Sequence, residues 1–467
     1  MKKIIIESLV LSQKTAILEE DKLVELLIED NINEKIVSNI YRGVVKNIKP
    51  GIEAGFVDIG LKKLAYLPIG KNKDIKSGQE IMVQINKEGI GDKGAKLNLE
   101  ISLSGRYLVY IPSNDRTTMS NKITEEKERF RLKKIVNAIN KENLGLIIRT
   151  EAQGCTLEEI KSDLEEIKAK YEVICKEFKL GIGPKLLYKE LDFASKYIKD
   201  NVNEYVDQII VNSEDKYEEL KLILKNINKD YINKLVLEKN KDVFNLYKVQ
   251  SQIEKSLNKK VWLKSGGYLI IEKTEAMTVI DVNTGKFTGN TKLDETVYKT
   301  NLEAASEIAR QLRLRDIGGI IIIDFIDMHK KQYKDELLKT LDIELKKDKR
   351  KSEVLGITRL SLVEVARRRD KKSVDSYYLG NCPTCKENSY LKSINYIIDS
   401  IEKESMRISE HTCYKKVNLE LNKDVYKEIN QNWKNILDTI SKKYDIIIEL
   451  KHSDCISYEK INIIYNT

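Results

Sequence analysis

Four consecutive isoleucines, residues 320–323, run directly into Asp324, and this stretch constrains the fold more than any other in the chain. An uninterrupted apolar run of this length is typical of a strand that is covered on both faces. Residues 268–272 and 277–282 read as two further strands, and residues 295–314 read as a long helix. We therefore predict an α/β core in the second half of the chain.

Two acids stand where these predicted strands end. Asp281 follows one apolar run, with Asn283 two residues later, and Asp324 follows the other, with Asp327 three residues later. Ligands of open α/β sheets bind outside the carboxyl ends of the strands, so both acids can point into one crevice. Two carboxylates, water and a substrate phosphate form the oxygen shell that Mg²⁺ prefers. Either acid alone reads as a turn or capping residue, but the pair favours a metal site, with Asp327 the weaker candidate.

Three arginines, Arg310, Arg313 and Arg315, lie at the end of the predicted long helix. Cations at a helix C-terminus complement the helix dipole, which is a sufficient structural reason for them. They can also border the path of an anionic substrate, because a guanidinium fork binds phosphate oxygens. Both readings stay open on the sequence alone.

Composition bounds the class of protein. With 467 residues, 41% hydrophobic and 33% charged, we expect an ordered protein of about three domains. The net charge of +9 permits a polyanionic partner, and basic residues crowd into 346–351 and 367–372, although a solvated face explains either run as well. No apolar stretch approaches the roughly 20 residues that cross a bilayer. With 6 Cys and no export signal, we expect no disulfide framework and a cytoplasmic location.

The first half of the chain shows two further patterns. Short β-type runs broken by Gly, Pro, Asn and Asp occur between residues 41 and 103, and their spacing favours a five-stranded OB-fold barrel. Residues 125–140 and 156–180 have helical periodicity, and residues 144–149 between them read as a strand. These segments predict a second compact α/β element after the barrel.

A CxxC motif, Cys382 to Cys385, provides half of a tetrahedral thiolate site for Zn²⁺. Two further ligands are needed, and Cys413 or Cys455 can supply them. A redox role is less attractive, because no strand that leads into a thioredoxin-like helix precedes the motif.

The stretches TEAMTVIDVNTGKFTG and TNLEAASEIARQLRLRDIGGIIIIDFIDM resemble the catalytic core of the ribonuclease E/G family, and the resemblance runs from near the N-terminus to about residue 400. It implies an Mg²⁺-dependent endoribonuclease of single-stranded RNA, acting in rRNA processing and mRNA turnover and giving 5′-monophosphate and 3′-hydroxyl products. Asp281 and Asp324 would bind Mg²⁺, Asn283 would orient them, and water would be the nucleophile.

The resemblance also implies RNA contacts in the barrel. Phe56 and Tyr66 would stack on unpaired bases, at roughly 1–3 kcal/mol for each contact, and Lys93 would lie near the RNA. From the residues alone, Phe56 reads as a core aromatic.

A pocket that senses a 5′-monophosphate is implied as well. Arg149 and Thr150 would clamp the phosphate, because a guanidinium fork can bind two oxygens at once. The other matching positions are Gly105, Val109 and, near a basic family position, Lys351. Many relatives have a basic pair where this chain has Asn121 and Lys122, so the charge of the pocket is expected to be lower.

The family's architecture implies a mixed α/β and α+β multidomain fold. The expected segments are a ribonuclease-H-like domain in two parts (1–34 and 186–257), an S1-type OB-fold (35–105), a 5′-end sensor region (106–185), a DNase-I-like catalytic domain (258–378), a zinc link (379–390) and a small C-terminal domain (391–467). Cys382 and Cys385 of a second chain would complete the zinc site, which makes the protein at least a dimer. The long arm that recruits partners in some relatives is expected to be missing.

Two other functions remain open. The chain can be an RNA-binding assembly protein in which the acids are vestigial, or a metal-dependent hydrolase of DNA or another phosphoester. Cleavage assays with RNA and with DNA of the same sequence separate these alternatives.

Overall fold

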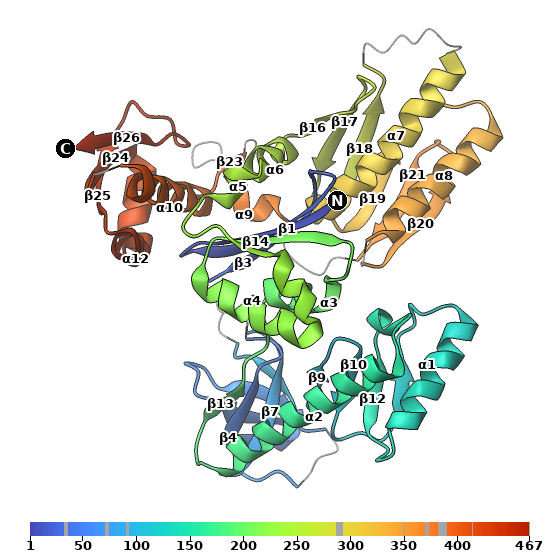
Figure 1. The fold of residues 1–467 in the computed structure, drawn as a ribbon. Helices are drawn as coiled ribbons and strands as arrows, with labels where there is room; N and C mark the ends of the chain where they lie inside the picture. Colours follow the sequence, from blue (N-terminus) through green and yellow to red (C-terminus); the bar gives the residue numbers. More distant parts are fainter. Residues whose placement is uncertain are drawn as a thin grey trace. The chain divides into compact units, whose positions relative to one another are not determined.

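The computed structural model describes residues 1–31, 36–70, 74–89, 93–285, 293–348, 350–368, 373–381, 390–412 and 414–466 (Figure 1). The chain forms two compact units. The first comprises Met1–Ile32 and Val202–Thr467, and the second comprises Asn33–Asn201. No helix in the described residues is long and apolar enough to cross a membrane.

The N-terminal strands of the first unit lie in a five-stranded mixed sheet of order β15-β14-β1-β2-β3. β1 runs antiparallel to β2 and parallel to β14, so a segment some 200 residues later completes the sheet. Helices α4 to α6 follow in the same stretch of chain. The bounds are β1 Lys2–Ser8, β2 Ser12–Glu19, β3 Lys22–Asp30, α4 Glu214–Ile227, β14 Val206–Val211, β15 Leu235–Leu237, α5 Val243–Leu246 and α6 Val249–Leu257.

The predicted α/β core is a six-stranded sheet of order β16-β17-β18-β19-β21-β20. The chain builds it from hairpins and one parallel crossover, because α7 connects β18 to the parallel strand β19. The strands are β16 Lys260–Trp262, β17 Tyr268–Lys273, β18 Met277–Asn283, β19 Gly319–Asp324, β20 Ser352–Ile357 and β21 Val363–Arg367. The helices are α7 Leu293–Leu314 and α8 Lys331–Lys346.

Helices α7 and α8 cover only one face of this sheet (Figure 1). Ile321 and Ile323 point into the core between sheet and helices, but Ile320 is 55% exposed and Ile322 is only half-buried. The prediction that this strand is covered on both faces is therefore wrong for the single chain. Side chains alternate between faces along a strand, and four isoleucines in a row conceal that alternation.

The C-terminal part of the first unit is a small α/β layer that packs on the N-terminal strands. A buried charge network joins them: Lys14 Nζ lies 2.6 Å from Asp399 Oδ2, and Lys403 Nζ lies 2.9 Å from Glu7 Oε1. A buried charge without its partner would strongly destabilise the fold, so these ion pairs favour the one arrangement in which the C-terminal layer packs on the N-terminal strands. The bounds are α9 Asp375–Tyr378, β22 Leu379–Asn381, β23 Tyr390–Lys392, α10 Ile394–His411, β24 Lys416–Asn422, α11 Lys423–Glu428, α12 Lys434–Tyr444, β25 Ile447–Ser453 and β26 Asn462–Asn466.

The second unit contains the predicted five-stranded β-barrel. Its strands follow the order β4-β5-β6-β8-β7, and β7 pairs back to β4 to close the barrel. A later strand, β13, adds to the outside of β4. The bounds are β4 Ile40–Lys49, β5 Ala54–Asp58, β6 Ala65–Pro68, β7 Glu80–Lys87, β8 Lys96–Asn98 and β13 Lys185–Tyr188.

The rest of the second unit is the predicted α/β element, a sheet of order β11-β12-β10-β9 with helices α1 and α2. Both helices and the strand between them were predicted within two residues of their ends. α2 begins with a capping box, in which Thr156 and Glu159 satisfy each other's backbone N–H groups. The bounds are β9 Leu103–Ser104, β10 Leu108–Ile111, β11 Thr117–Met119, α1 Glu126–Ile139, β12 Gly145–Ile148, α2 Leu157–Lys179 and α3 Phe193–Asn201.

Candidate active site and RNA contacts

The two predicted acids meet on neighbouring strands. Asp281 in β18 and Asp324 at the end of β19 are direct partners in the parallel register. Paired residues on adjacent strands point to the same face, about 5 Å apart. Ile280 and Ile323, one position earlier on each strand, are buried under the helices, so both acids project from the open face of the sheet.

Among the residues that the structure describes, no Lys or Arg forms an ion pair with either acid. Burial raises the pKa of Asp324 above its ordinary value, and repulsion from Asp281 and then Asp327 adds to the shift. Among the described residues, no three His, Cys, Asp or Glu side chains form a closed metal cage. Two convergent carboxylates suit an ion that keeps most of its water, which is how Mg²⁺ is usually held. The donor set therefore fits Mg²⁺.

Asn283 supports the acid beside it. Its Nδ2 donates to Asp281 Oδ2 at 2.7 Å, and the two residues share a face of β18 at the period-two spacing of a strand. The hydrogen bond fixes the carboxylate and leaves its other oxygen for a ligand. An amide in this position is the usual support for a metal-binding carboxylate.

The open face beside the acids also carries aromatic residues that the sequence analysis missed. Tyr268 is the register partner of Asn283, and Trp262 is the register partner of Tyr268. The chain between the two aromatics contains Ser265-Gly266-Gly267, and Gly266 has a φ of +93°. A Gly-rich connection between two short β-type runs is a hairpin signal, and it would have placed the two rings opposite each other.

The arginines at the end of α7 have structural partners. Arg310 donates to both oxygens of Glu307 and to the carbonyl of Leu23, and Arg313 donates to the carbonyl of Val24. Arg315 is buried and donates to Asn258. These contacts fix α7 to β3 and to the segment before β16. They favour the structural reading of the arginines over a place in the substrate path.

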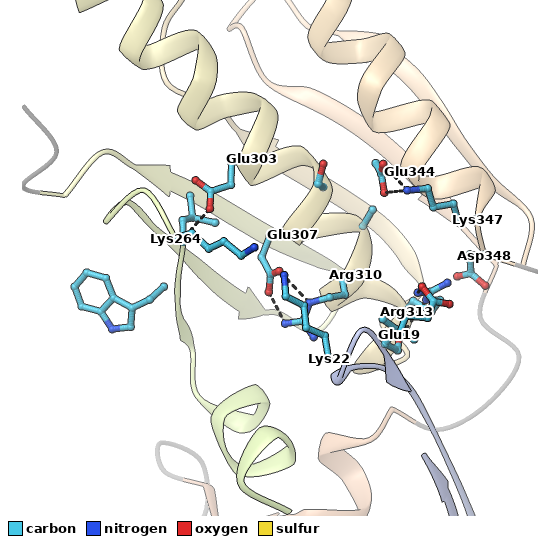
Figure 2. Close-up of a pocket in the computed structure, with 15 residues that line it drawn as sticks. Glu19, Lys22, Lys264, Glu303, Glu307, Arg310, Arg313, Glu344, Lys347 and Asp348 are labelled. Atoms are coloured by element: carbon cyan, nitrogen blue, oxygen red, sulfur yellow. Dashed lines mark hydrogen bonds and ion pairs between the residues drawn. The ribbon is translucent and has the colours of Figure 1, made fainter. Parts of the chain in front are cut away.

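A pocket of about 360 Å³ lies between α7, α8, β3 and the β16–β17 loop (Figure 2). Its acidic side chains are already engaged: Glu303 accepts from the backbone N–H groups of Lys264 and Ser265, and Glu307 binds an arginine. Lys22 contacts Lys264, and this hydrogen-bonded contact is the largest cause that lowers the pKa of Lys22. Asp281 and Asp324 do not line this pocket.

In the barrel, Phe56 and Tyr66 are register partners on β5 and β6. Their ring centroids lie 6.3 Å apart, and both rings are partly exposed, whereas Val57 and Ala65 beside them fill the core. Phe56 is thus a surface aromatic and not a core residue. Two lysines that the sequence analysis missed flank the rings: Lys49 Nζ lies 5.4 Å from the Phe56 centroid, and Lys96 pairs with Tyr66 in register. Lys93, which it had singled out, is exposed in the loop before β8.

The Arg149 guanidinium already contacts acidic and carbonyl groups of the protein. Nη1 and Nη2 each donate to one oxygen of Asp200 on α3 at 2.8 Å, and Nη1 also donates to the carbonyl of Gly105 at 2.5 Å. Glu151 lies 3.5 Å from Nε. Burial lowers the pKa of Arg149, but the bond to Asp200 and its charge outweigh burial, and the net shift is upward. No pattern in the sequence pointed to Asp200, which is 51 residues from Arg149.

The other predicted members of this pocket lie nearby in the same unit. Thr150 Oγ1 and Ser120 Oγ share a hydrogen bond of 3.0 Å, and Val109 lies in β10 opposite Ile147. Gly105 is required by packing, because a Cβ there would come within 2.4 Å of Asp163 Oδ2. That carboxylate caps the turn by accepting three successive backbone N–H groups, those of Arg106, Tyr107 and Leu108.

Three further predicted site residues are Lys351, Cys382 and Cys385. Lys351 is exposed in the first unit, just before β20, whereas Arg149 belongs to the second. Cys382 and Cys385 lie outside the described residues. In the second basic run, Arg367 is buried and donates to Asp348 and Asp316, so it is not available to a phosphate.

Comparison with known proteins assigns the chain to a family. A model of the Ribonuclease E/G family matches residues 102–370, which include both acids and Arg149. Ribonuclease G of Salmonella typhimurium is 38% identical over 414 residues, 84% of each chain. Ribonuclease G of Haemophilus influenzae is 37% identical over 85% of each chain, and ribonuclease E of a Nostoc species is 35% identical over 80% of this chain and 57% of its own length. This chain belongs to the ribonuclease E/G family.

Proposed function

We propose that this protein is an Mg²⁺-dependent endoribonuclease that cleaves single-stranded RNA with the carboxylates of Asp281 and Asp324. Its enzyme class, an endoribonuclease that hydrolyses phosphodiester bonds, follows from its family. The observation that carries the catalytic assignment is the direct pairing of the two acids on an open sheet face, where no cation of the described residues pairs with them.

Asp281 and Asp324 would hold the ion, and Asn283 would keep the first carboxylate in position. When bound, Mg²⁺ supplies Lewis-acid stabilisation of charge on the phosphate and activation of a water molecule. The chain's own contribution is to concentrate negative charge at one point of an otherwise apolar strand pair. Hydrolysis by water would leave a 5′-monophosphate and a 3′-hydroxyl.

The barrel would bind unpaired bases through Phe56 and Tyr66, and Lys49, Lys93 and Lys96 would contact phosphates. Partly exposed rings next to lysines on one barrel face support this role, since stacking tolerates any base and the cations follow the backbone. In this proposal, the barrel is the family's S1-type OB-fold. The two-part N-terminal sheet is the ribonuclease-H-like domain, and the sheet with the acids is the DNase-I-like domain.

Arg149, Thr150, Gly105 and Val109 would read a 5′-monophosphate on the substrate. Asp200 and Glu151 offset the charge of Arg149 before any ligand arrives. We therefore propose that the preference for a 5′-monophosphate is present but modest. Transcript targets in rRNA processing and mRNA turnover belong to the same proposal.

Zn²⁺ would be held by Cys382 and Cys385 together with the same pair from a second copy of the chain. The support is the CxxC spacing, which suits half of a tetrahedral site. Replacing Cys382 by Ser or chelating zinc should shift the protein to smaller species in light scattering. An unchanged mass would remove the shared zinc.

The test of the proposed function is incubation of an AU-rich single-stranded RNA and a DNA of the same sequence with the protein, with Mg²⁺ or with EDTA. We expect internal cleavage of RNA only, dependent on Mg²⁺, with fragments that a 5′-monophosphate-dependent exonuclease degrades. Binding without cleavage would favour an assembly protein, and preferential cleavage of DNA would favour a different nuclease.

A further inference from the structure

We propose that Trp262 and Tyr268, with Lys260 beside both rings, form a platform on which an unpaired base of the RNA stacks beside the catalytic acids. We call these three residues the aromatic platform. The inference rests on the proposed function, because it names a substrate-binding subsite next to Asp281 and Asp324.

The geometry of the platform is that of one ammonium in contact with two neighbouring rings. The Trp262 and Tyr268 ring centroids lie 5.4 Å apart at an interplanar angle of 63°. Lys260 Nζ lies 4.1 Å from the Trp262 centroid and 3.7 Å from the Tyr268 centroid. In the part of the chain that the structure describes, Lys260 forms no ion pair with a carboxylate. Its charge is therefore available to a phosphate.

The platform shares a surface with the acids. Trp262 pairs with Tyr268, Tyr268 with Asn283, and Asp281 with Asp324, so these side chains lie on the open face of one continuous sheet. Val261, Leu269 and Val282 point the other way, into the core under α7. With neighbouring strands about 4.8 Å apart, Trp262 lies roughly 10 Å from Asn283, within reach of one short single-stranded segment.

The exposure of Trp262 and the positive charge of Lys260 favour RNA as the partner that binds this surface. Trp262 is 64% exposed although tryptophan is usually well buried, so its ring gains little from folding alone. An exposed indole with an adjacent unpaired ammonium matches both parts of a nucleotide, the base and the phosphate. A protein partner could bury the ring and pair the ammonium with a carboxylate, but the substrate of an endoribonuclease is RNA, and RNA has to reach the acids on this same face. A second copy of this chain is therefore the competing occupant for the test.

The experiment uses intrinsic fluorescence, because the chain has only 2 Trp, Trp262 and Trp433. The parent protein is the double variant Trp433→Phe, Asp281→Asn, without metal, so that Trp262 is the sole tryptophan and RNA is not cut; excitation at a wavelength that tyrosine does not absorb makes Trp262 the sole emitter. We expect a ten-nucleotide single-stranded RNA to quench the emission. An abasic oligomer of the same length should not quench it, because stacking needs a base.

Affinity is then measured by the anisotropy of labelled RNA. Trp262→Ala should weaken binding by about 5-fold to 150-fold, the equivalent of one lost stacking contact. Trp262→Phe should keep most of the affinity, and Tyr205→Ala, which removes another exposed ring of the first unit, should keep all of it. Thermal unfolding confirms that each variant is folded.

Several results would overturn the proposal. Stacking is excluded if RNA does not change the fluorescence of Trp262, or if the abasic oligomer changes it by the same amount. Emission that depends on protein concentration without RNA assigns the surface to self-association. If Trp262→Ala binds RNA like its parent while the wild-type protein still cleaves RNA, the platform is wrong and the proposed function stands. A parent protein that binds no RNA would refute both the aromatic platform and the proposed function.

Discussion

Replacing Asp324 by Asn should make the metal-free protein more stable while it abolishes cleavage. Asp324 faces Asp281 across two adjacent strands, and burial and this repulsion raise its pKa. Two unit charges about 5 Å apart repel by about 1 kcal/mol in a water-like medium and by about 3 kcal/mol at an effective dielectric of 20. Because Asp324 is exposed, screening places the gain near the lower figure, about 1 kcal/mol.

The assay is thermal unfolding in EDTA and in Mg²⁺. A gain of about 1 kcal/mol corresponds to a Tm roughly 1.5–2 °C higher for a unit of about 300 residues. Mg²⁺ should raise the Tm of the wild-type protein, because an ion that binds only the folded state stabilises it, and should have little effect on the variant. Asp327→Asn is the matched control: it removes a charge that contributes less to the shift, so its gain should be smaller.

The pH dependence has a defined sign. The pKa of Asp324 is raised in the folded state, so ionising this carboxyl favours unfolding. The wild-type protein therefore shows its full loss of stability only above the raised pKa. The advantage of Asp324→Asn should therefore shrink as the pH falls through that pKa and disappear in the ordinary aspartate range. A variant that is no more stable than the wild type in EDTA at neutral pH would refute the repulsion on which the metal assignment rests.

Three other changes test separate parts of the molecule. Asp200→Asn should raise the ratio of kcat/KM for 5′-monophosphate RNA over 5′-hydroxyl RNA on the order of tenfold, because Arg149 loses a charged partner that competes with the phosphate. Arg149→Gln should bring the ratio to one. An unchanged ratio in Asp200→Asn would exclude competition between Asp200 and the phosphate for Arg149. Phe56→Ala should weaken RNA binding by about 1–3 kcal/mol in anisotropy and leave the Tm unchanged, whereas a large fall in Tm would return the ring to the core. Arg367→Ala should destabilise the first unit by about 3 kcal/mol in urea unfolding, since it leaves the half-buried Asp348 without its cation and the buried Asp316 with Arg350 alone.

The sequence predicted best those features that depend on residues close together in the chain. The acids of the candidate site follow apolar runs, and that spacing placed Asp281 and Asp324 on strands of one sheet; Asp324 does end β19, but β18 continues to Asn283, so Asp281 lies inside its strand and the predicted strand end was wrong there. The capped helix α2 and the strand before it were predicted because periodicity and caps are local signals. The roles assigned to Phe56, Arg149 and the cysteines came from family resemblance and not from such patterns.

What the sequence missed depends on residues far apart in the chain or on an ambiguous pattern. Asp200 reaches Arg149 across 51 positions, and no periodicity encodes that contact. Four consecutive isoleucines fit a strand covered on one face or on both, and only the position of α7 and α8 decides between them. Arg367 belongs to a basic run that looks solvated, yet its neighbours in space are two aspartates.

The central claim is that Asp281 and Asp324 cleave RNA by holding Mg²⁺, and the direct measurement is the cleavage rate against Mg²⁺ concentration for wild type, Asp281→Asn, Asp324→Asn and Asn283→Ala. The account predicts that Asn283→Ala loses about 10- to 100-fold in rate or metal affinity, and that each acid variant loses more while its RNA affinity stays near that of the wild type. Wild-type rates in Asp281→Asn or Asp324→Asn, or equal cleavage in EDTA, would contradict it.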